Sequence, residues 1–123
     1  MTEIPGHLPH RFPFLLVDRI LVREPGTRVV AERLLSQDLP SGTLLLEMLA
    51  QTAGFLEPES LHGERIFLAG IQEATFEGAA RAGDRLRMEV APEGAFGGLQ
   101  KVRGEVRCDD RLLCAAALLV KRL

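Results

Sequence analysis

The sequence predicts an α+β fold in which a curved antiparallel sheet wraps around one central apolar helix. Residues 43–57 are apolar on nearly every face of a helix, which is typical of a buried helix. Residues 85–90 and 101–108 alternate apolar and charged side chains, as strands with one buried face do. One buried helix among several strands needs a sheet curved around it. A chain of 123 residues fits a single domain over residues 1–123.

The N-terminal third predicts an arm followed by a hairpin. Residues 1–13 contain three prolines, which favour an extended or briefly helical arm. Residues 14–22 are mostly apolar and residues 28–35 alternate loosely, so both are expected to form paired strands. Between them, residues 24–27 are Glu-Pro-Gly-Thr, a sequence suited to the turn of that hairpin.

The central helix carries few polar residues. Good helix formers dominate residues 43–57, and Pro58 ends the run. Glu47 and Gln51 are four residues apart, so they share one stripe of the helix. Because a buried glutamate is rare unless it is paired or functional, Glu47 is the first candidate for a catalytic residue. The alternative is a glutamate that hydrogen-bonds Gln51 or faces water at a dimer interface.

The C-terminal half predicts a run of antiparallel strands. Residues 65–71 are a short apolar strand candidate, and residues 112–120 form a continuous apolar run that suggests a strand buried on both faces. Residues 94–98 contain three glycines between two strands. They are expected to form a hairpin loop and not a phosphate-binding loop.

Cys108 and Cys114 are expected to be free thiols. They flank a predicted turn at residues 109–110. The register about that turn would pair Cys108 with Arg111 or Leu112 and not with Cys114, so a disulfide is not expected. Free thiols fit a reducing, cytoplasmic compartment.

Charge and hydropathy exclude several classes of protein. The net charge of −2 does not suggest a nucleic-acid binder. No stretch reaches the roughly 18 apolar residues of a membrane helix, and the N-terminus lacks the apolar core of a signal peptide. His7 and His10 are separated by a proline and have no further ligands nearby, so neither a metal site nor a bound cofactor is expected.

Six basic residues recur between positions 81 and 107. They are Arg81, Arg85, Arg87, Lys101, Arg103 and Arg107. Two interpretations remain open, the solvated face of a sheet and a docking patch for an acidic partner.

Three ordered stretches match the motifs of one known family. Residues 8–20 are LPHRFPFLLVDRI, and residues 42–51 are GTLLLEMLAQ. Residues 67–71 are FLAGI, followed by Phe76 and by GDRL at residues 83–86. In this order and spacing they resemble the opening, central-helix and later-strand motifs of the FabZ family, the dehydratases of type II fatty-acid synthesis.

The resemblance implies a hot-dog fold, a homodimer or dimer of dimers, and acyl chains carried on acyl carrier protein. The family removes water from a 3-hydroxyacyl thioester. A histidine of one subunit takes the proton beside the thioester carbonyl. A carboxylate on the central helix of the other subunit protonates the leaving hydroxyl, and backbone amides at the start of that helix hold the thioester oxygen.

By this resemblance Glu47 is the catalytic acid. Gln51, on the same stripe of the helix, either orients Glu47 or satisfies a polar interface. Gly42 and Thr43 supply the amides, since the first N–H groups of a helix lack intrahelical acceptors and lie at the positive end of its dipole. Ordinary helix capping is the alternative for Gly42 and Thr43.

One part of the family pattern is absent. The family's histidine lies in a Gly-His-Phe-Pro loop just before the helix, whereas residues 31–42 of this chain are shortened and contain no histidine. His10, His7 and Asp38 are the candidate substitute bases, with His62 a weaker one. The alternatives are a surface or structural role for the histidines and a capping or turn role for Asp38.

Three functions follow from these observations. The first is an active 3-hydroxyacyl-thioester dehydratase, a lyase acting on acyl carrier protein or coenzyme A thioesters. The second is a non-catalytic or complementary subunit that binds acyl thioesters and pairs, as a heterodimer, with a hot-dog chain bearing the histidine. The third is an acyl thioesterase in which Glu47 activates water.

Overall fold

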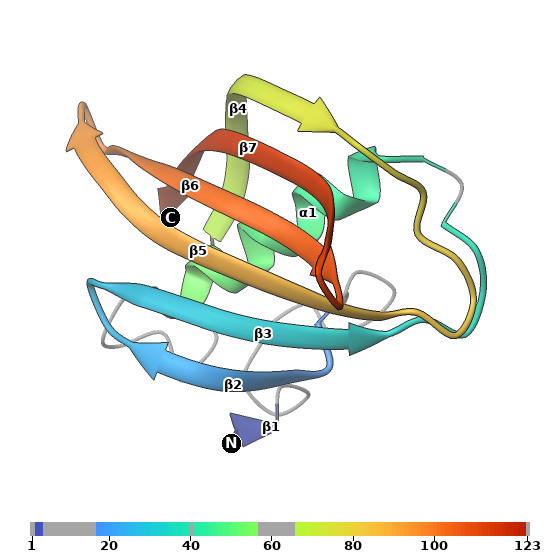
Figure 1. Ribbon diagram of the computed structural model, residues 1–123. Coiled ribbons are helices and arrows are strands. Elements are labelled where there is room, and N and C mark those ends of the chain that lie inside the picture. Colours follow the sequence, from blue (N-terminus) through green and yellow to red (C-terminus); the bar gives the residue numbers. More distant parts are fainter. Residues whose placement is uncertain (1, 4–16, 40, 57–65, 123) are drawn as a thin grey trace.

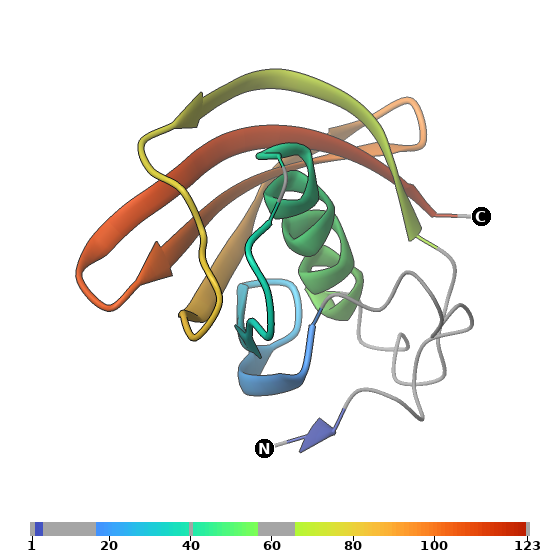
Figure 2. The same ribbon diagram turned by 90° about the vertical axis from the view of Figure 1, so that its right-hand side faces the viewer.

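The computed structural model describes residues 2–3, 17–39, 41–56 and 66–122. One helix lies in the concave side of a strongly curved sheet (Figures 1 and 2). Within the described residues, the sheet has seven strands in the order β1-β2-β3-β5-β6-β7-β4, and every neighbouring pair is antiparallel. The predicted α+β class is confirmed. A single domain over the whole chain stays a prediction.

The elements have the following bounds. The strands are β1 (Thr2–Glu3), β2 (Arg19–Glu24), β3 (Arg28–Leu34), β4 (Ile66–Phe76), β5 (Arg85–Phe96), β6 (Leu99–Cys108) and β7 (Arg111–Arg122). The helix is α1 (Thr43–Ala53), continued by the short 3₁₀ helix η1 (Gly54–Leu56).

The first hairpin has the predicted turn but begins later than predicted. Thr27 donates its backbone N–H to the Glu24 carbonyl at 2.9 Å, and Gly26 has φ +77°, which is the conformation that the third residue of a type II turn needs. Strand β2 starts at Arg19, after residues 17 and 18, whereas residues 14–16 of the predicted strand lie outside the described residues. Asp18 precedes the strand, and its carboxylate accepts a hydrogen bond from the Leu34 N–H at 2.8 Å. The aspartate thus ties the entry of β2 to the end of β3.

Two strands of the C-terminal half are longer than the sequence predicts. Strand β5 runs to Phe96, so only Gly97 and Gly98 of the predicted loop form the turn. Both have positive φ, 57° and 81°, as a two-residue hairpin turn requires. Strand β4 runs to Phe76 and contains two register irregularities against β7. These bulges break the alternation by which a sequence reveals a strand.

Helix α1 is buried on most of its faces, as predicted. Leu45, Leu46, Met48, Leu49, Ala50, Thr52 and Ala53 are buried. The hydroxyl of Thr52 donates to the Met48 carbonyl at 2.7 Å, so the buried polar side chain is satisfied. Beneath the helix, Gly104 of β6 lets Leu49 approach the sheet backbone, because a Cβ at this glycine would lie 2.9 Å from Leu49 Cδ2.

The first hairpin holds the C-terminal end of the helical segment. The Arg23 guanidinium donates to the Phe55 carbonyl at 2.9 Å, and the Gly26 N–H donates to the Leu56 carbonyl at 2.7 Å. Carbonyls at a helix end have no intrahelical donor, so these two bonds hold η1, the end of the helical segment, against the first hairpin.

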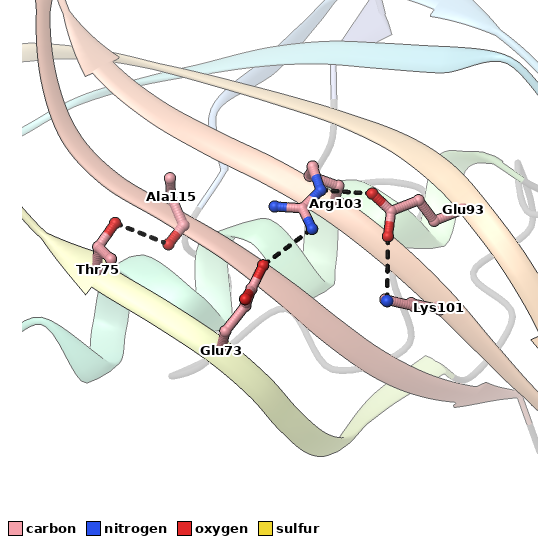
Figure 3. A network of polar contacts seen from close by, with 6 residues as sticks. All are labelled: Glu73, Thr75, Glu93, Lys101, Arg103 and Ala115. Carbon is pink, nitrogen blue, oxygen red and sulfur yellow. Dashed lines mark hydrogen bonds and ion pairs between the residues drawn. The ribbon is translucent and has the colours of Figure 1, made fainter.

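Ion pairs cover the outer face of the sheet (Figure 3). Arg103 of β6 bonds Glu93 of β5 and reaches across β7 to Glu73 of β4 at 2.9 Å, while Lys101 lies 3.3 Å from Glu93. Ala117 of β7 is in register between Glu73 and Arg103 and is fully buried. Arg85 and Arg107 also pair with carboxylates. Four of the six predicted cations are thus neutralised, which favours the solvated-face interpretation; the acidic docking patch stays a prediction.

Replacing Arg103 by Gln should destabilise the protein more near pH 7 than at about pH 3. The hydrogen bond from Arg103 lowers the pKa of the Glu93 carboxyl below its ordinary value of 4.5, and Arg103 itself has a raised pKa. A carboxyl with a lowered folded-state pKa stabilises the fold above its ordinary pKa and loses this contribution as the pH falls through the folded value. Urea unfolding at both pH values measures the difference, and equal destabilisation at both would contradict the network's role.

Both described cysteines are free and buried, and Cys108 pairs with Arg111 across the turn as predicted. Burial raises the pKa of the Cys114 thiol to about 11. Because the thiolate is the reactive form, Cys114 should resist N-ethylmaleimide in the folded protein and react once urea unfolds it. Peptide mass spectrometry measures this, and rapid labelling of native Cys114 would contradict the packing described.

Among the described residues, no helix is long and apolar enough to cross a membrane. The same residues contain no cluster of three or more His, Cys, Asp or Glu side chains that could hold a metal ion.

Candidate active site

Among the residues that the structure describes, the start of helix α1 has no side-chain cap hydrogen bond. Gly42 is the N-cap residue, has helical φ and ψ, and makes no side-chain cap hydrogen bond. Its carbonyl accepts the first helical bonds, from Leu45 N–H at 3.0 Å and Leu46 N–H at 3.4 Å. The first turn contains no acidic residue. The positive end of the helix dipole therefore has no carboxylate of its own turn beside it.

A cavity of about 590 Å³ opens at this helix start. Its walls come from two chain segments, the end of the connection into α1 and the residues after β4. The described lining residues are Leu39, Ser41, Gly42, Thr43, Leu45, Phe76, Glu77, Gly78, Ala79 and Ala80. Most are small or apolar, and the volume is within the range of small-molecule sites. The predicted pair Gly42 and Thr43 therefore lies at a space that a ligand can occupy.

Phe76 forms the wall of the cavity next to Gly42. A Cβ at Gly42 would lie 2.5 Å from the Phe76 ring carbon Cε1, so only glycine allows the ring to lie this close to the helix start. The residue is still 51% exposed. Phe76 therefore presents an accessible aromatic side chain to the cavity.

Backbone hydrogen bonds join the connection between β3 and α1 to the segment that leads into β5. Leu35 exchanges backbone hydrogen bonds with this segment, donating to Asp84 and accepting from Gly83, both at 2.9 Å. Leu39 N–H donates to the Ala80 carbonyl at 3.1 Å. The connection therefore has a defined course along the cavity wall, and its described residues include no histidine.

Glu47 and Gln51 lie on the stripe of α1 that the sheet leaves partly open. Both are half-buried, and neither is among the described residues that line the cavity. Glu47 is four residues beyond Thr43, which is about 6 Å further along the helix axis. It takes part in none of the ion pairs between described residues. Within one chain, Gly42 and Thr43 thus line the described cavity, whereas Glu47 does not.

Comparison with known proteins decides the family. No family model matches the chain. A 3-hydroxyacyl-[acyl-carrier-protein] dehydratase FabZ from Chloroflexus aggregans is 42% identical over 134 residues, which cover 97% of this chain and 92% of the relative. The chain belongs to the FabZ family. FabZ of Coxiella burnetii is 35% identical with 97% and 96% coverage, and FabZ of Thermotoga petrophila is 41% identical with 92% and 90% coverage. This FabZ-family chain is a dehydratase-like protein of fatty-acid biosynthesis.

Solved structures confirm the hot-dog fold of this FabZ-family chain. The dehydratase heterocomplex ApeI:P of Xenorhabdus doucetiae matches with a TM-score of 0.84 at 19% identity, covering all of this chain and 92% of that one. A hypothetical thioesterase of Streptococcus pneumoniae with coenzyme A matches with a TM-score of 0.67 at 12% identity, with 85% and 84% coverage. At these identities the likeness concerns the fold alone.

The FabZ relatives are longer within the matched region. The alignment with the Chloroflexus protein spans 134 residues, whereas this chain has 123 in total. The relative therefore has residues in that stretch for which this chain has no counterpart.

Of the three candidate substitute bases of this FabZ-family chain, Asp38 is the one that lies among the described residues. The Asp38 carboxylate accepts a hydrogen bond from the Ala82 N–H at 2.8 Å, and Asp38 is not among the described lining residues of the cavity. His7 and His10 lie outside the described residues, as does His62. The Asp38 carboxylate is thus engaged in a long-range contact with Ala82, and its role as a substitute base stays a prediction.

Sequence reasoning missed the contribution of the residues after β4. Phe76 and Glu77 line the cavity, yet they are more than thirty positions from Gly42 in the sequence. Only the three-dimensional approach of the end of β4 to the helix start brings them together. The predicted strand at residues 65–71 stopped short of both.

Proposed function

We propose that the chain is an active dehydratase that converts 3-hydroxyacyl thioesters to enoyl thioesters and catalyses the reverse hydration. The observation that carries this proposal is the cavity at the uncapped start of α1. The thioester oxygen would lie at the N–H groups of Gly42 and Thr43, and the acyl group would be carried on acyl carrier protein or coenzyme A. The two described free cysteines fit a cytoplasmic location.

The helix start supplies electrostatic stabilisation. Removing the proton beside the carbonyl makes the thioester enolate-like, so negative charge develops on its oxygen. Preorganised N–H donors aimed at such an oxygen are typically worth about 3 kcal/mol of barrier each. The absence of a side-chain cap supports this role, because the first-turn amides retain their capacity for a ligand.

Glu47 would protonate the hydroxyl that leaves as water, and Gln51 would orient it. The family resemblance implies that the carboxylate and the amides belong to the same helix. Because Glu47 does not line the cavity of its own chain, we propose instead that it serves the cavity of a second copy. Strand β4 ends the sheet, with β7 as its neighbour, and Ile71 on it is 48% exposed. An open strand edge with exposed apolar side chains favours pairing with another chain, so a homodimer or a dimer of dimers is expected.

A complementary subunit is the second candidate function. It is favoured by the connection before α1, whose described residues contain no histidine, and by the longer FabZ relative. The Xenorhabdus dehydratase of this fold is a heterocomplex, so a partner with the histidine is a realistic arrangement for such chains. This candidate predicts that a homodimer has no turnover and that a histidine-bearing partner restores it.

Turnover by the purified protein separates the candidates. An enoyl thioester on acyl carrier protein, and the same acyl group on coenzyme A, would be followed by loss of the conjugated absorbance, with a free-thiol assay alongside. Hydration without thiol release supports the dehydratase, and thiol release would instead indicate the thioesterase. No reaction from a folded homodimer would reject the stand-alone enzyme and favour the complementary subunit.

A further inference from the structure

We propose that Glu77 is the catalytic base that takes the proton from the carbon beside the thioester carbonyl. This inference rests on the proposed dehydratase function and names the group that would stand in for the family's absent histidine. Three observations support it. Glu77 lines the cavity, it is the one ionisable residue among the described lining residues, and the carboxylate of Asp38 already accepts a hydrogen bond.

The backbone at Glu77 is fixed next to the helix start. Its N–H donates to the Leu113 carbonyl at 2.8 Å. On one side Phe76 lies against Gly42. On the other side Gly78 packs against Leu113, since a Cβ at this glycine would lie 3.2 Å from Leu113 Cδ2. Glu77 is therefore held at the cavity by contacts before and after it.

Glu77 has the only ionisable side chain among the described residues that line the cavity. No ion pair between described residues includes it. The residue is exposed. A glutamate side chain has three rotatable bonds, so its carboxylate can change rotamer rapidly at the opening of the cavity. Asp38, by contrast, has its carboxylate engaged by the Ala82 N–H.

The proposed reaction balances without a cofactor or redox partner. The C2–H bond breaks, and its proton goes to a Glu77 carboxylate oxygen. The electron pair of that bond forms the C2=C3 double bond as the C3–O bond breaks. The leaving hydroxyl takes a proton from Glu47 of the second copy and departs as water. Solvent then carries the proton from Glu77 back to Glu47, which restores the starting state.

Glu77→Gln should lower kcat for hydration of an enoyl thioester by about 100-fold or more, with a much smaller change in KM, since a positioned base typically contributes 10²- to 10⁴-fold. Glu105→Gln is the matched control, because it makes the same chemical change on the outer face of the sheet, where Glu105 pairs with Arg107. The control should retain wild-type turnover.

A small carboxylate distinguishes a base from a structural residue. Formate added to Glu77→Ala should restore part of the lost turnover, because formate can take the proton in the vacated space, whereas a structural defect would not respond. If Glu77→Gln retains turnover within about threefold of wild type while Glu47→Gln loses it, Glu77 is not the base and the dehydratase function stands. If the wild-type homodimer has no turnover, both proposals are rejected.

Discussion

Glu47→Gln is expected to lower enoyl-thioester hydration by about 10²- to 10⁴-fold while changing the free energy of unfolding by no more than about 0.5 kcal/mol. The carboxamide has nearly the same shape as the carboxyl group but cannot transfer the proton. The side chain is half-buried on the open stripe of α1, so its replacement leaves the core unchanged. Steady-state kinetics and urea unfolding of the same preparation measure both quantities.

The prediction requires that Glu47→Gln lowers turnover and leaves the free energy of unfolding nearly unchanged. Glu105→Gln, on the outer face of the sheet, should leave both quantities near wild type. Turnover by Glu47→Gln at the wild-type rate would remove Glu47 from the mechanism. A large loss of stability in this variant would instead assign the glutamate a structural role.

The second large effect concerns the contact between helix and sheet at Leu49 and Gly104. A Cβ at Gly104 would lie 2.9 Å from Leu49 Cδ2 and 3.1 Å from Val90 Cγ1. Gly104→Ala therefore overpacks the core and should cost about 1–3 kcal/mol of unfolding free energy. Leu49 is fully buried, so Leu49→Ala should cost about 2–5 kcal/mol through lost transfer free energy and the cavity left behind.

The double variant Leu49→Ala/Gly104→Ala tests whether the two residues share one space. The methyl group that Gly104→Ala introduces can enter the volume that Leu49 vacates, so the double variant should be more stable than the sum of the single effects by at least about 1 kcal/mol. The relief is expected to be incomplete, because the approach to Val90 remains. Additive effects would mean that the helix does not lie on Gly104 as described.

The sequence contained enough information for the main architecture. Helix α1 is apolar on nearly all faces, and the structure buries most of them. Apolar and charged residues alternate around Val102, Val106 and Cys108, and burial alternates there in the same way. The strand ends were less predictable. Gly94 lies next to a bulge in β5, and a bulge or a glycine turn interrupts the period on which such predictions rest.

The candidate site was predictable only in part. Local motifs indicated Gly42, Thr43, Glu47 and Gln51, and the helix begins where this prediction requires. The wall formed by Phe76 and Glu77 depends on a tertiary contact between the end of β4 and the start of α1, which leaves no periodic signal in the sequence. The Asp38 carboxylate accepts a hydrogen bond from the Ala82 N–H, and that contact too is tertiary.

The central claim is that the cavity of one chain works with Glu47 of another. Mixing two inactive homodimers, Glu47→Gln and Gly42→Ala, tests it directly, because the methyl group added by Gly42→Ala would collide with the Phe76 ring and distort the helix start. A heterodimer would combine the intact cavity of the first chain with the intact Glu47 of the second. After subunit exchange, turnover should recover to about one quarter of wild type, since half of the dimers would hold one working site of two. If the exchanged mixture, verified by mass spectrometry, shows no turnover above that of the two variants, the site does not span two chains.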